Sequence, residues 1–370
     1  MTLDELPSRS VGIVLGTRPE IIKLAHVIRL LGPAARVIHT GQHYDPNLSG
    51  VFFRAFGLGD PHVELEVGGK SRGAQIGEAI SGLEAHLATD PPSAVIVQGD
   101  TNAVLAAAVA ANAREVPLVH IEAGLRSYDR AMPEEHNRVV CDHLADLCLT
   151  PTEVSAANLS REGIPSDRVV VTGNTVIEAV TTLLPPPSKR RRLLDTFGLE
   201  PSSFVLSTLH RPENVDRLAS FSAILEELAR SPLPVVLPLH PRSRRRAEEF
   251  GLGHLLHGIH VIDPLGYPEF LGLLAECAVA VSDSGGIQEE VSVLKRPVVV
   301  VRRSTERPEV LGTFARLVPP GPGIGETLRS LVDDLVGVHA RLAAIPSPYG
   351  DGTASERSVA ATVEMLERMS

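Results

Sequence analysis

Cysteine is scarce in this sequence. Its 370 residues include three cysteines, Cys141, Cys148 and Cys277, with no C-x-x-C spacing between them. An odd number of cysteines without that spacing argues against a disulfide framework and against a zinc site. We therefore expect three buried thiols in a reducing cytosol.

Long apolar runs and excess positive charge are also missing. The longest apolar stretches, AVLAAAVAANA and PVVVV, fall short of the ~20 residues that span a bilayer, and the opening MTLDELPSRS lacks the apolar core of a signal peptide. The formal net charge is −10, so no global field attracts nucleic acid or an anionic membrane. We expect a cytoplasmic protein that binds neither, and any polyanionic ligand needs a local cluster of positive groups.

What the sequence does contain is a regular alternation of strand and helix patterns. In the first half, apolar runs typical of buried strands occur at residues 11–16, 35–41, 93–100 and 117–124, and amphipathic helical patterns lie between them. The segment 183–200, rich in Pro, Lys and Arg, reads as a linker followed by a short helix, and the alternation then restarts. This pattern predicts α/β architecture with parallel sheets covered on both faces.

We therefore predict two Rossmann-type, doubly wound domains. The first spans residues 1–182 and is completed by a C-terminal helix at 353–370, and the second spans 183–352. Two such domains facing each other form a cleft between the carboxyl ends of their strands, where ligands of open α/β sheets bind. The charged stretches GTRPE, QGDTN, EAGLR, HRPEN and DSGG all follow predicted strands, as the lining of such a cleft would.

The stretch SDSGGIQEE (282–290) has the clearest local chemistry. A strand, a tight Ser-Gly-Gly turn and a helix that starts near Gly286 expose backbone N–H groups at a helix N-terminus, which suits a phosphate. Ser284 adds a hydroxyl, and Glu290 lies one turn in, within reach of a ribose diol. A plain capped turn is the alternative.

Positive groups occur in two other strand-to-helix turns. LGTRPEIIK places Arg18 and Lys23 near a helix start, and TLHRPEN holds His210 and Arg211. The first turn matches neither G-x-G-x-x-G nor a Walker loop, so it gives no case for NAD or ATP. These groups can neutralise a diphosphate, or each can form a surface salt bridge.

Three acids, Asp100, Glu122 and Glu134, follow strands and would share the cleft. Mutual repulsion and burial raise the pKa of such carboxyls, which favours proton transfer near neutral pH. For Asp100, a helix-capping role before Thr101 is an equal alternative. Glu135 is expected to pair with Arg138 on one helix face.

Three histidines in GLGHLLHGIH have a spacing that suggests metal ligands. No acid or cysteine supports a metal site there, so we expect His254, His257 and His260 to have a surface or packing role.

At these motifs the chain resembles the non-hydrolysing UDP-N-acetylglucosamine 2-epimerases. The resemblance rests on stretches in family order over nearly the whole chain, including GTRPEIIKLA, TGQHYD, VQGDTN, HIEAGLRS, MPEEHNR, TLHRPENVD, LHPRSRRR, SDSGGIQEE and STERPE. It implies a GT-B-like fold, a homodimer, and inversion at C2 of UDP-GlcNAc to give UDP-ManNAc. In that mechanism UDP is eliminated to leave 2-acetamidoglucal and then adds back, with no metal or other cofactor.

Position by position, the resemblance assigns roles to the residues singled out above. The expected catalytic groups are Asp100, Glu122, Glu134 and His210. The expected UDP-sugar ligands are Arg18, Lys23, Phe270, Ser284, Gly285, Gly286, Glu290 and Arg307.

Some bacterial members also bind a second UDP-GlcNAc as an activator. The matching residues are Gln42, His43, Glu135 and His240. Asp45, however, stands where the regulated members carry an amide, and its negative charge would repel a diphosphate, so we expect little need for an activator.

Three rival functions use much of the same site. A hydrolysing 2-epimerase would release UDP and ManNAc, a GT-B glycosyltransferase would not require the three acids, and a catalytically dead nucleotide-sugar sensor would lack turnover. The presence of all three acids argues against the sensor.

Overall fold

A computed structural model describes residues 5–7, 10–42 and 46–369 of the chain. The chain divides into two compact units, an N-terminal unit of residues 1–179 and 349–370 and a C-terminal unit of residues 180–348. Each unit is built around its own parallel β-sheet. The predicted pair of doubly wound α/β domains is confirmed.

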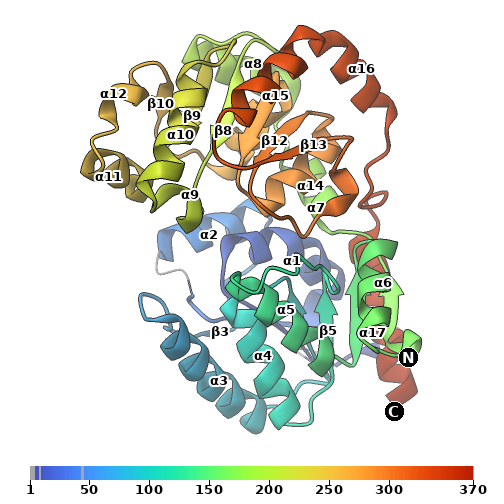
Figure 1. Cartoon of the computed structure of the whole chain (residues 1–370). Coiled ribbons are helices and arrows are strands. Elements are labelled where there is room, and N and C mark those ends of the chain that lie inside the picture. Colours follow the sequence, from blue (N-terminus) through green and yellow to red (C-terminus); the bar gives the residue numbers. More distant parts are fainter. Residues whose placement is uncertain (1–4, 8–9, 43–45, 370) are drawn as a thin grey trace. The chain divides into compact units, whose positions relative to one another are not determined.

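The N-terminal unit contains a seven-stranded sheet in the order β3-β2-β1-β4-β5-β6-β7. Its strands are β1 (Val11–Leu15), β2 (Ala35–His39), β3 (Val63–Glu64), β4 (Ala94–Gln98), β5 (Leu118–Ile121), β6 (Leu147–Thr150) and β7 (Val169–Val171). Its helices are α1 (Arg18–Leu31), α2 (Pro46–Ala55), α3 (Arg72–Thr89), α4 (Asn102–Ala113), α5 (Pro133–Leu144), α6 (Glu153–Arg161) and α17 (Ala354–Met369), and α7 (Val176–Leu183) leads out of the unit. The last helix, α17, packs on α1, so the end of the chain returns to this unit (Figure 1).

The C-terminal unit contains a six-stranded sheet in the order β10-β9-β8-β11-β12-β13. Its strands are β8 (Val205–Thr208), β9 (Val235–Pro238), β10 (His260–Ile262), β11 (Val279–Ser282), β12 (Val298–Val301) and β13 (Ala315–Val318). Its helices are α8 (Pro187–Phe197), α9 (Pro212–Val215), α10 (Leu218–Ala229), α11 (Pro241–Glu249), α12 (Gly253–Leu256), α13 (Tyr267–Glu276), α14 (Gly285–Leu294), α15 (Gly323–Asp333) and α16 (Leu335–Ala344).

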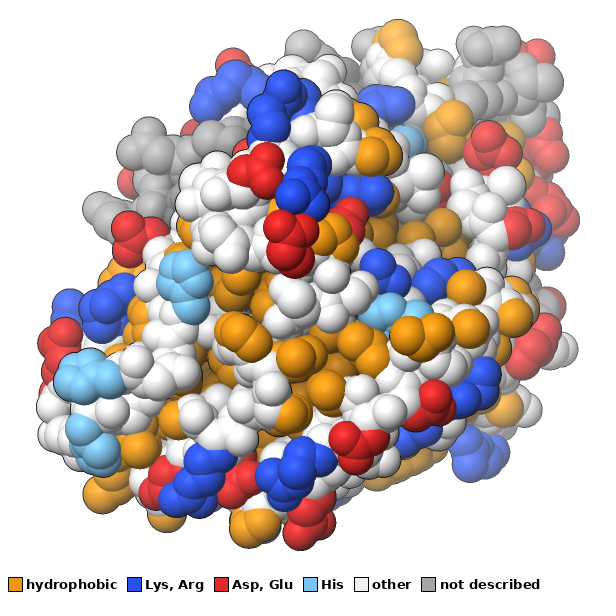
Figure 2. Space-filling view, turned by 90° about the horizontal axis from the view of Figure 1, so that it is seen from above, with side chains coloured by type: hydrophobic (Ala, Val, Ile, Leu, Met, Phe, Trp, Pro, Cys, Tyr) orange, Lys and Arg blue, Asp and Glu red, His pale blue; other side chains and the backbone are white. Residues whose placement is uncertain are grey.

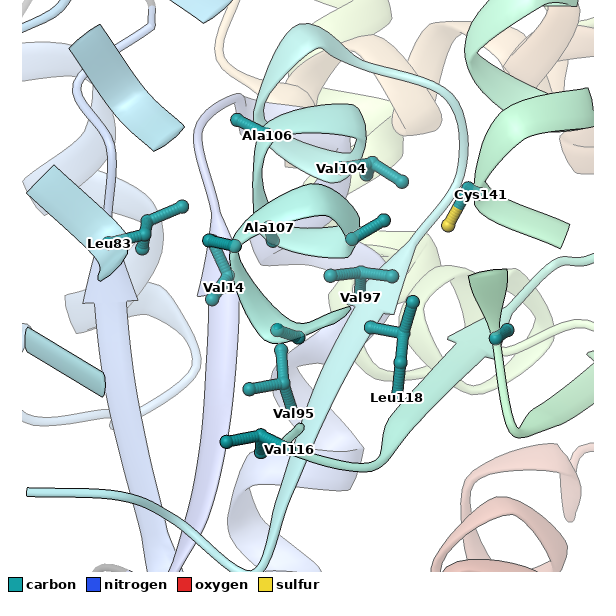
Figure 3. Packing of buried hydrophobic residues seen from close by; sticks show 14 of the residues in the cluster. Val14, Leu83, Val95, Val97, Val104, Ala106, Ala107, Val116, Leu118 and Cys141 are labelled. Carbon is teal, nitrogen blue, oxygen red and sulfur yellow. The ribbon is translucent and has the colours of Figure 1, made fainter. Parts of the chain in front are cut away.

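Buried apolar strands explain why these sheets are parallel and covered. Every residue of β1, β2, β4 and β5 is buried, which suits strands with helices on both faces. In the N-terminal unit, α4 lies across β1, β4 and β5, and its Val104 and Ala107 pack with Val14 and Val97 (Figure 3). Each fully buried valine contributes on the order of 1.5–3 kcal/mol of transfer free energy.

The strand order places a switch point in each sheet. In the N-terminal sheet, β1 pairs with β2 on one side and β4 on the other, and in the C-terminal sheet β8 lies between β9 and β11. The chain reverses its direction of winding at these pairs, so the loops after β1 and β4, and after β8 and β11, diverge at the carboxyl edge. Such edges are where doubly wound sheets bind ligands.

Two smaller expectations, one for the cysteines and one for three histidines, are also met. All three cysteines are buried and free, and His254, His257 and His260 are exposed. In the described residues, none of the helices has both the length and the apolar character needed to cross a membrane. On the face drawn in Figure 2, Lys and Arg side chains are interspersed with Asp and Glu.

Candidate functional site

Three of the predicted site residues follow adjacent strands in the N-terminal unit. Arg18 comes after β1, Asp100 after β4 and Glu122 directly after β5, and these strands are neighbours in the order β1-β4-β5. Because all three strands are parallel, their carboxyl ends lie at one edge of the sheet. The expectation that the charged stretches follow strands is confirmed.

Glu122 is held by a buried ion pair. The Lys23 Nζ lies 2.6 Å from Glu122 Oε2, with side chains 8% and 4% exposed, and the Gln98 amide donates to the same oxygen. The backbone of Glu122 has a φ of 69°, in the left-handed region that residues with a Cβ avoid. Strain of this kind is retained where neighbouring groups force it, and it re-aims the side chain.

Asp100 pairs with a cation from α5. Its Oδ2 lies 2.5 Å from Arg138 Nη2, and its carbonyl accepts a hydrogen bond from Asn137 Nδ2 at 2.8 Å. The alternative that Asp100 caps the following helix is wrong, because the N-cap of α4 is Thr101, whose hydroxyl accepts from Val104 N–H. Asp100 and Glu122 are each paired with a cation. Their sequence positions had instead suggested acids that face and repel one another.

The first turn of α5 presents two acids with different surroundings. Glu135 is buried and pairs with Arg138 at 2.6 Å, as predicted, and it also accepts the backbone N–H groups of Ser127 and Tyr128. Glu134 is half-buried, and within the described residues its carboxylate makes no hydrogen bond or ion pair. Glu135 therefore holds the loop before the helix, and Glu134 is the acid left available for a ligand.

The start of α1 combines an available cation with a buried acid. Arg18, the first residue of α1, is half-buried and has no ion pair among the described residues. Glu20 is buried, and it accepts from Gly16 N–H at 3.0 Å and from the Thr101 hydroxyl at 2.9 Å. Burial raises the pKa of Glu20 to about 7, against the lowering effect of these hydrogen bonds. Glu20 thus ties the loop after β1 to the loop after β4.

In the C-terminal unit, a carboxylate orients the predicted histidine. His210 Nδ1 lies 2.9 Å from Asp283 Oδ1, and the imidazole is 59% exposed, whereas Asp283 is fully buried. Burial works to raise the pKa of Asp283, but hydrogen bonds from His210, Arg211 and Asn214 lower it overall. Since Nδ1–H donates to this carboxylate, Nε2 is the nitrogen left for a ligand.

The predicted anion turn lies at the start of α14. This helix begins at Gly285, and no side chain caps its amino terminus. A Cβ on Gly285 would lie 2.5 Å from Arg307 Nη1 and 2.7 Å from Glu306 Oε1, so a larger residue there would displace these two side chains. Arg307 Nε donates to Glu289 Oε1 at 2.6 Å, and Nη1 donates to Glu306. The buried side chains of Arg307 and Glu306 therefore lie against the turn at Gly285.

Glu290, predicted to contact ribose, has a phenol partner. The Tyr267 hydroxyl donates to Glu290 Oε1 at 2.8 Å, and Phe270 lies half-buried on the same helix as Tyr267. Burial and the Glu290 carboxylate raise the pKa of Tyr267 well above its usual value, so the phenol stays protonated. Tyr267 therefore holds one oxygen of the Glu290 carboxylate, Oε1, in place.

Three of the residues predicted for a second site have structural contacts of their own. Gln42 Oε1 accepts from Ala103 N–H at 3.0 Å, Glu135 holds the 127–128 loop, and His240 accepts from Arg242 N–H at 3.2 Å as the N-cap of α11. His43 and Asp45 lie outside the described residues.

Glu20, Asp283 and Tyr267 were not predicted from the sequence. Glu20 and Asp283 lie inside stretches chosen for other residues, GTRPE and SDSGG. An acid beside a predicted ligand residue was the available signal. Tyr267 had no such signal, because it reaches Glu290 from a different helix.

Comparisons with known proteins agree with one another. A family profile described as UDP-N-acetylglucosamine 2-epimerase matches residues 33–363. The UDP-N-acetylglucosamine 2-epimerase of Methanococcus maripaludis is 37% identical, over 94% of this chain and 96% of its own. The UDP-2,3-diacetamido-2,3-dideoxy-D-glucuronate 2-epimerase of Pseudomonas aeruginosa is 35% identical, over 93% and 96% of the two chains.

A similar solved structure is that of the UDP-GlcNAc 2-epimerase from Methanocaldococcus jannaschii in complex with UDP-GlcNAc and UDP. It has a TM-score of 0.84 and 36% identity, over 96% of this chain and 99% of that one.

Proposed function

Because the chain belongs to the UDP-N-acetylglucosamine 2-epimerase family, we propose that it interconverts UDP-GlcNAc and UDP-ManNAc without releasing the free sugar. The C2 proton is not next to a ketone, so simple deprotonation is unfavourable. Elimination avoids this difficulty. A base removes the C2 proton, the C1–O bond breaks, and UDP leaves with the electron pair to give 2-acetamidoglucal. A proton then adds to C2 from the other face while the UDP oxygen bonds to C1 again.

This reaction needs acid–base groups and groups that stabilise a departing diphosphate. In the proposal, Asp100, Glu122 and Glu134 handle the protons. Arg18, His210 and the α14 turn hold the diphosphate, and Glu290 holds the ribose. The observation that carries the proposal is the placement of Asp100 and Glu122 after adjacent parallel strands, each beside a cation, with Glu122 in a strained backbone conformation.

NMR of UDP-GlcNAc incubated with the protein in D2O tests the reaction. We expect UDP-ManNAc to form with deuterium at C2 and UDP to remain attached to the sugar at equilibrium. UDP-GlcNAc with ¹⁸O in the C1–O–P bridge should also scramble that label into the β-phosphate, because UDP is free to rotate before it returns. Epimer that keeps its C2 proton, or a bridge label that never scrambles, contradicts the elimination.

The same NMR assay, repeated with another substrate or with an added acceptor, separates the alternatives. Free ManNAc and UDP that accumulate together identify a hydrolysing enzyme. No reaction with UDP-GlcNAc, but epimerisation of UDP-2,3-diacetamido-2,3-dideoxyglucuronate, assigns the activity named for the Pseudomonas aeruginosa relative. A new glycoside that forms only with an added acceptor indicates a glycosyltransferase.

For regulation, we propose that the enzyme needs no activating UDP-GlcNAc. Asp45 introduces an acid where regulated relatives are expected to carry an amide, and two like charges 4 Å apart repel by roughly 1 kcal/mol in water and more when desolvated. Allosteric coupling is itself worth only about 1–3 kcal/mol. A reaction started from pure UDP-ManNAc should therefore begin at once. An enzyme that stays idle until trace UDP-GlcNAc is added would show that the second site works.

A further inference from the structure

A buried histidine lies beneath the loops that carry two of the proposed catalytic acids. His120, on β5, is fully buried. Its Nε2 lies 2.8 Å from the carbonyl oxygen of Gly99, and its Nδ1 lies 2.7 Å from Asp142 Oδ1. None of the roles proposed above uses this side chain.

Its two contacts determine where its protons are. A carbonyl oxygen can only accept a hydrogen bond, so Nε2 must carry a proton. The other oxygen of Asp142 accepts from Gly124 N–H at 3.1 Å and lies 2.7 Å from Arg126 Nη1, an arrangement that suits an ionised carboxylate. Oδ1 then also accepts, so Nδ1 must donate as well. With both nitrogens donating, the ring is an imidazolium.

The charged groups around this ring make a buried cation tolerable. Asp142 faces it from α5, next to the Cys141 thiol, which is neutral because burial raises its pKa, and Arg126 joins Asp142 from the loop after β5. Arg126 in turn pairs with Glu162 at 2.6 Å. The positive charges of His120 and Arg126 are therefore balanced by the two carboxylates of this cluster, Asp142 and Glu162. Burial by itself lowers the pKa of His120, but Cys141 and Asp142 raise it well above the usual value.

The cluster is attached to the backbone on both sides of the proposed site. Gly99, held by Nε2, immediately precedes Asp100. Gly124, held by Asp142, lies two residues after Glu122, in the turn where Glu122 has its left-handed φ. A Cβ at Gly124 would lie 2.4 Å from the Ser155 carbonyl oxygen, so this turn packs closely against α6.

We propose that His120 is a positioning residue, kept as a buried imidazolium, that holds the backbone of Asp100 and Glu122 in place for proton transfer at C2. The inference rests on the proposed function, since it names what His120 positions. This positioning role requires a second proton on the ring, because a neutral imidazole can donate only one of the two hydrogen bonds. Without that proton, the ring would no longer bind both the loop after β4 and the Asp142 carboxylate that holds the turn after β5.

The first test needs no variant. Two-bond ¹H–¹⁵N spectra of histidine-labelled protein at pH 8.5 should show a ring with both nitrogens protonated and its N–H protons protected from exchange with solvent. The chain has 14 histidines, so the signal must be assigned to one of them. His120→Gln should remove the signal. If no protected imidazolium is present at pH 8.5, or if the signal survives in His120→Gln, the proposal is overturned.

The second test measures catalysis. His120→Gln should lower kcat for UDP-GlcNAc by about 10²-fold, the cost of misplacing reacting groups by roughly 1 Å, while the Kd for UDP from calorimetry changes less than about twofold. His339→Gln is the matched control, because His339 Nε2 also bonds a backbone carbonyl, that of Ala278 at 2.8 Å, within the C-terminal unit. It should leave kcat unchanged.

The outcomes separate this proposal from the proposed function. Wild-type protein that does not act on UDP-GlcNAc refutes the function, while the spectra still report whether the imidazolium exists. Active wild-type protein with an unchanged kcat in His120→Gln refutes the positioning role. Equal loss of kcat and of UDP affinity also refutes it, since that pattern indicates general loss of structure. If His120→Gln does not fold, Asp142→Asn takes its place, because it removes the carboxylate bound to Nδ1 and should abolish the imidazolium signal and lower kcat in the same way, and an unchanged signal or kcat overturns the proposal.

Discussion

Replacing Lys23 by Met removes the cation from a pair that is almost completely buried. The two charged atoms of Lys23 and Glu122 lie 2.6 Å apart. At an effective dielectric constant of about 20, Coulomb's law gives roughly 6 kcal/mol of attraction at that separation. The cost of taking both charges out of water offsets much of this attraction. Removal of one partner, however, leaves an uncompensated buried charge, which costs about 3–5 kcal/mol.

We expect Lys23→Met to lower the melting temperature of the N-terminal unit by roughly 6–20 °C, as follows from that free energy for a unit of about 200 residues. Glu122→Gln should destabilise it similarly, because it leaves the ammonium group unpaired. The double variant should recover most of the lost stability. It should not recover turnover, which we expect to fall by about 10²–10⁴ whenever this proposed proton-transfer acid is absent.

Scanning calorimetry of the four proteins measures the coupling between the two residues. The exposed pair of Arg357 and Asp351 in the same unit, with side chains 48% and 58% exposed, supplies the control. Arg357→Met should change stability by less than about 1 kcal/mol. If the effects of Lys23→Met and Glu122→Gln simply add in the double variant, the two side chains are not coupled and the reasoning from their burial is refuted.

Three further changes test other parts of the structure. Asp283→Asn should lower turnover by about 10²–10⁴ and change the pH–rate profile, because His210 loses the carboxylate that selects its tautomer; an unchanged profile from pH 5 to 9 contradicts this role. Tyr267→Phe should weaken UDP binding in calorimetry by about 5–10-fold with kcat retained, since one hydrogen bond to Glu290, worth about 1 kcal/mol, is lost. The folded protein binds a proton on Glu20 more tightly than the unfolded chain does, so this residue favours folding less as the pH rises from 4.5 to about 7. Melting temperatures measured between pH 5 and 8 should therefore fall less steeply in Glu20→Gln than in the wild type, and parallel curves would show that Glu20 does not titrate there.

Much of the fold was predictable because its signals are local. Apolar runs such as VGIVLG and SAVIVQGD predict buried parallel strands, and the helices between them have their own periodicity and start signals, such as Pro19 near the start of α1. The positions of Asp100, Glu122 and His210 after strands followed from the same patterns. Even the start of α14 was predicted to within one residue, because the glycine pair interrupts the strand pattern just before the helical pattern begins.

The partners of these side chains were decided by the tertiary structure. Lys23 and Glu122 are 99 residues apart and meet only because the sheet brings the ends of its strands to one edge. Thr101, and not Asp100, caps α4, because Arg138 of α5 binds the aspartate. The sequence by itself determined where strands end and which residue types stand there, since these depend on local periodicity. Which of those groups are paired, buried or oriented depends on the order of the strands in the sheet, and that order arises from packing between segments distant in the chain.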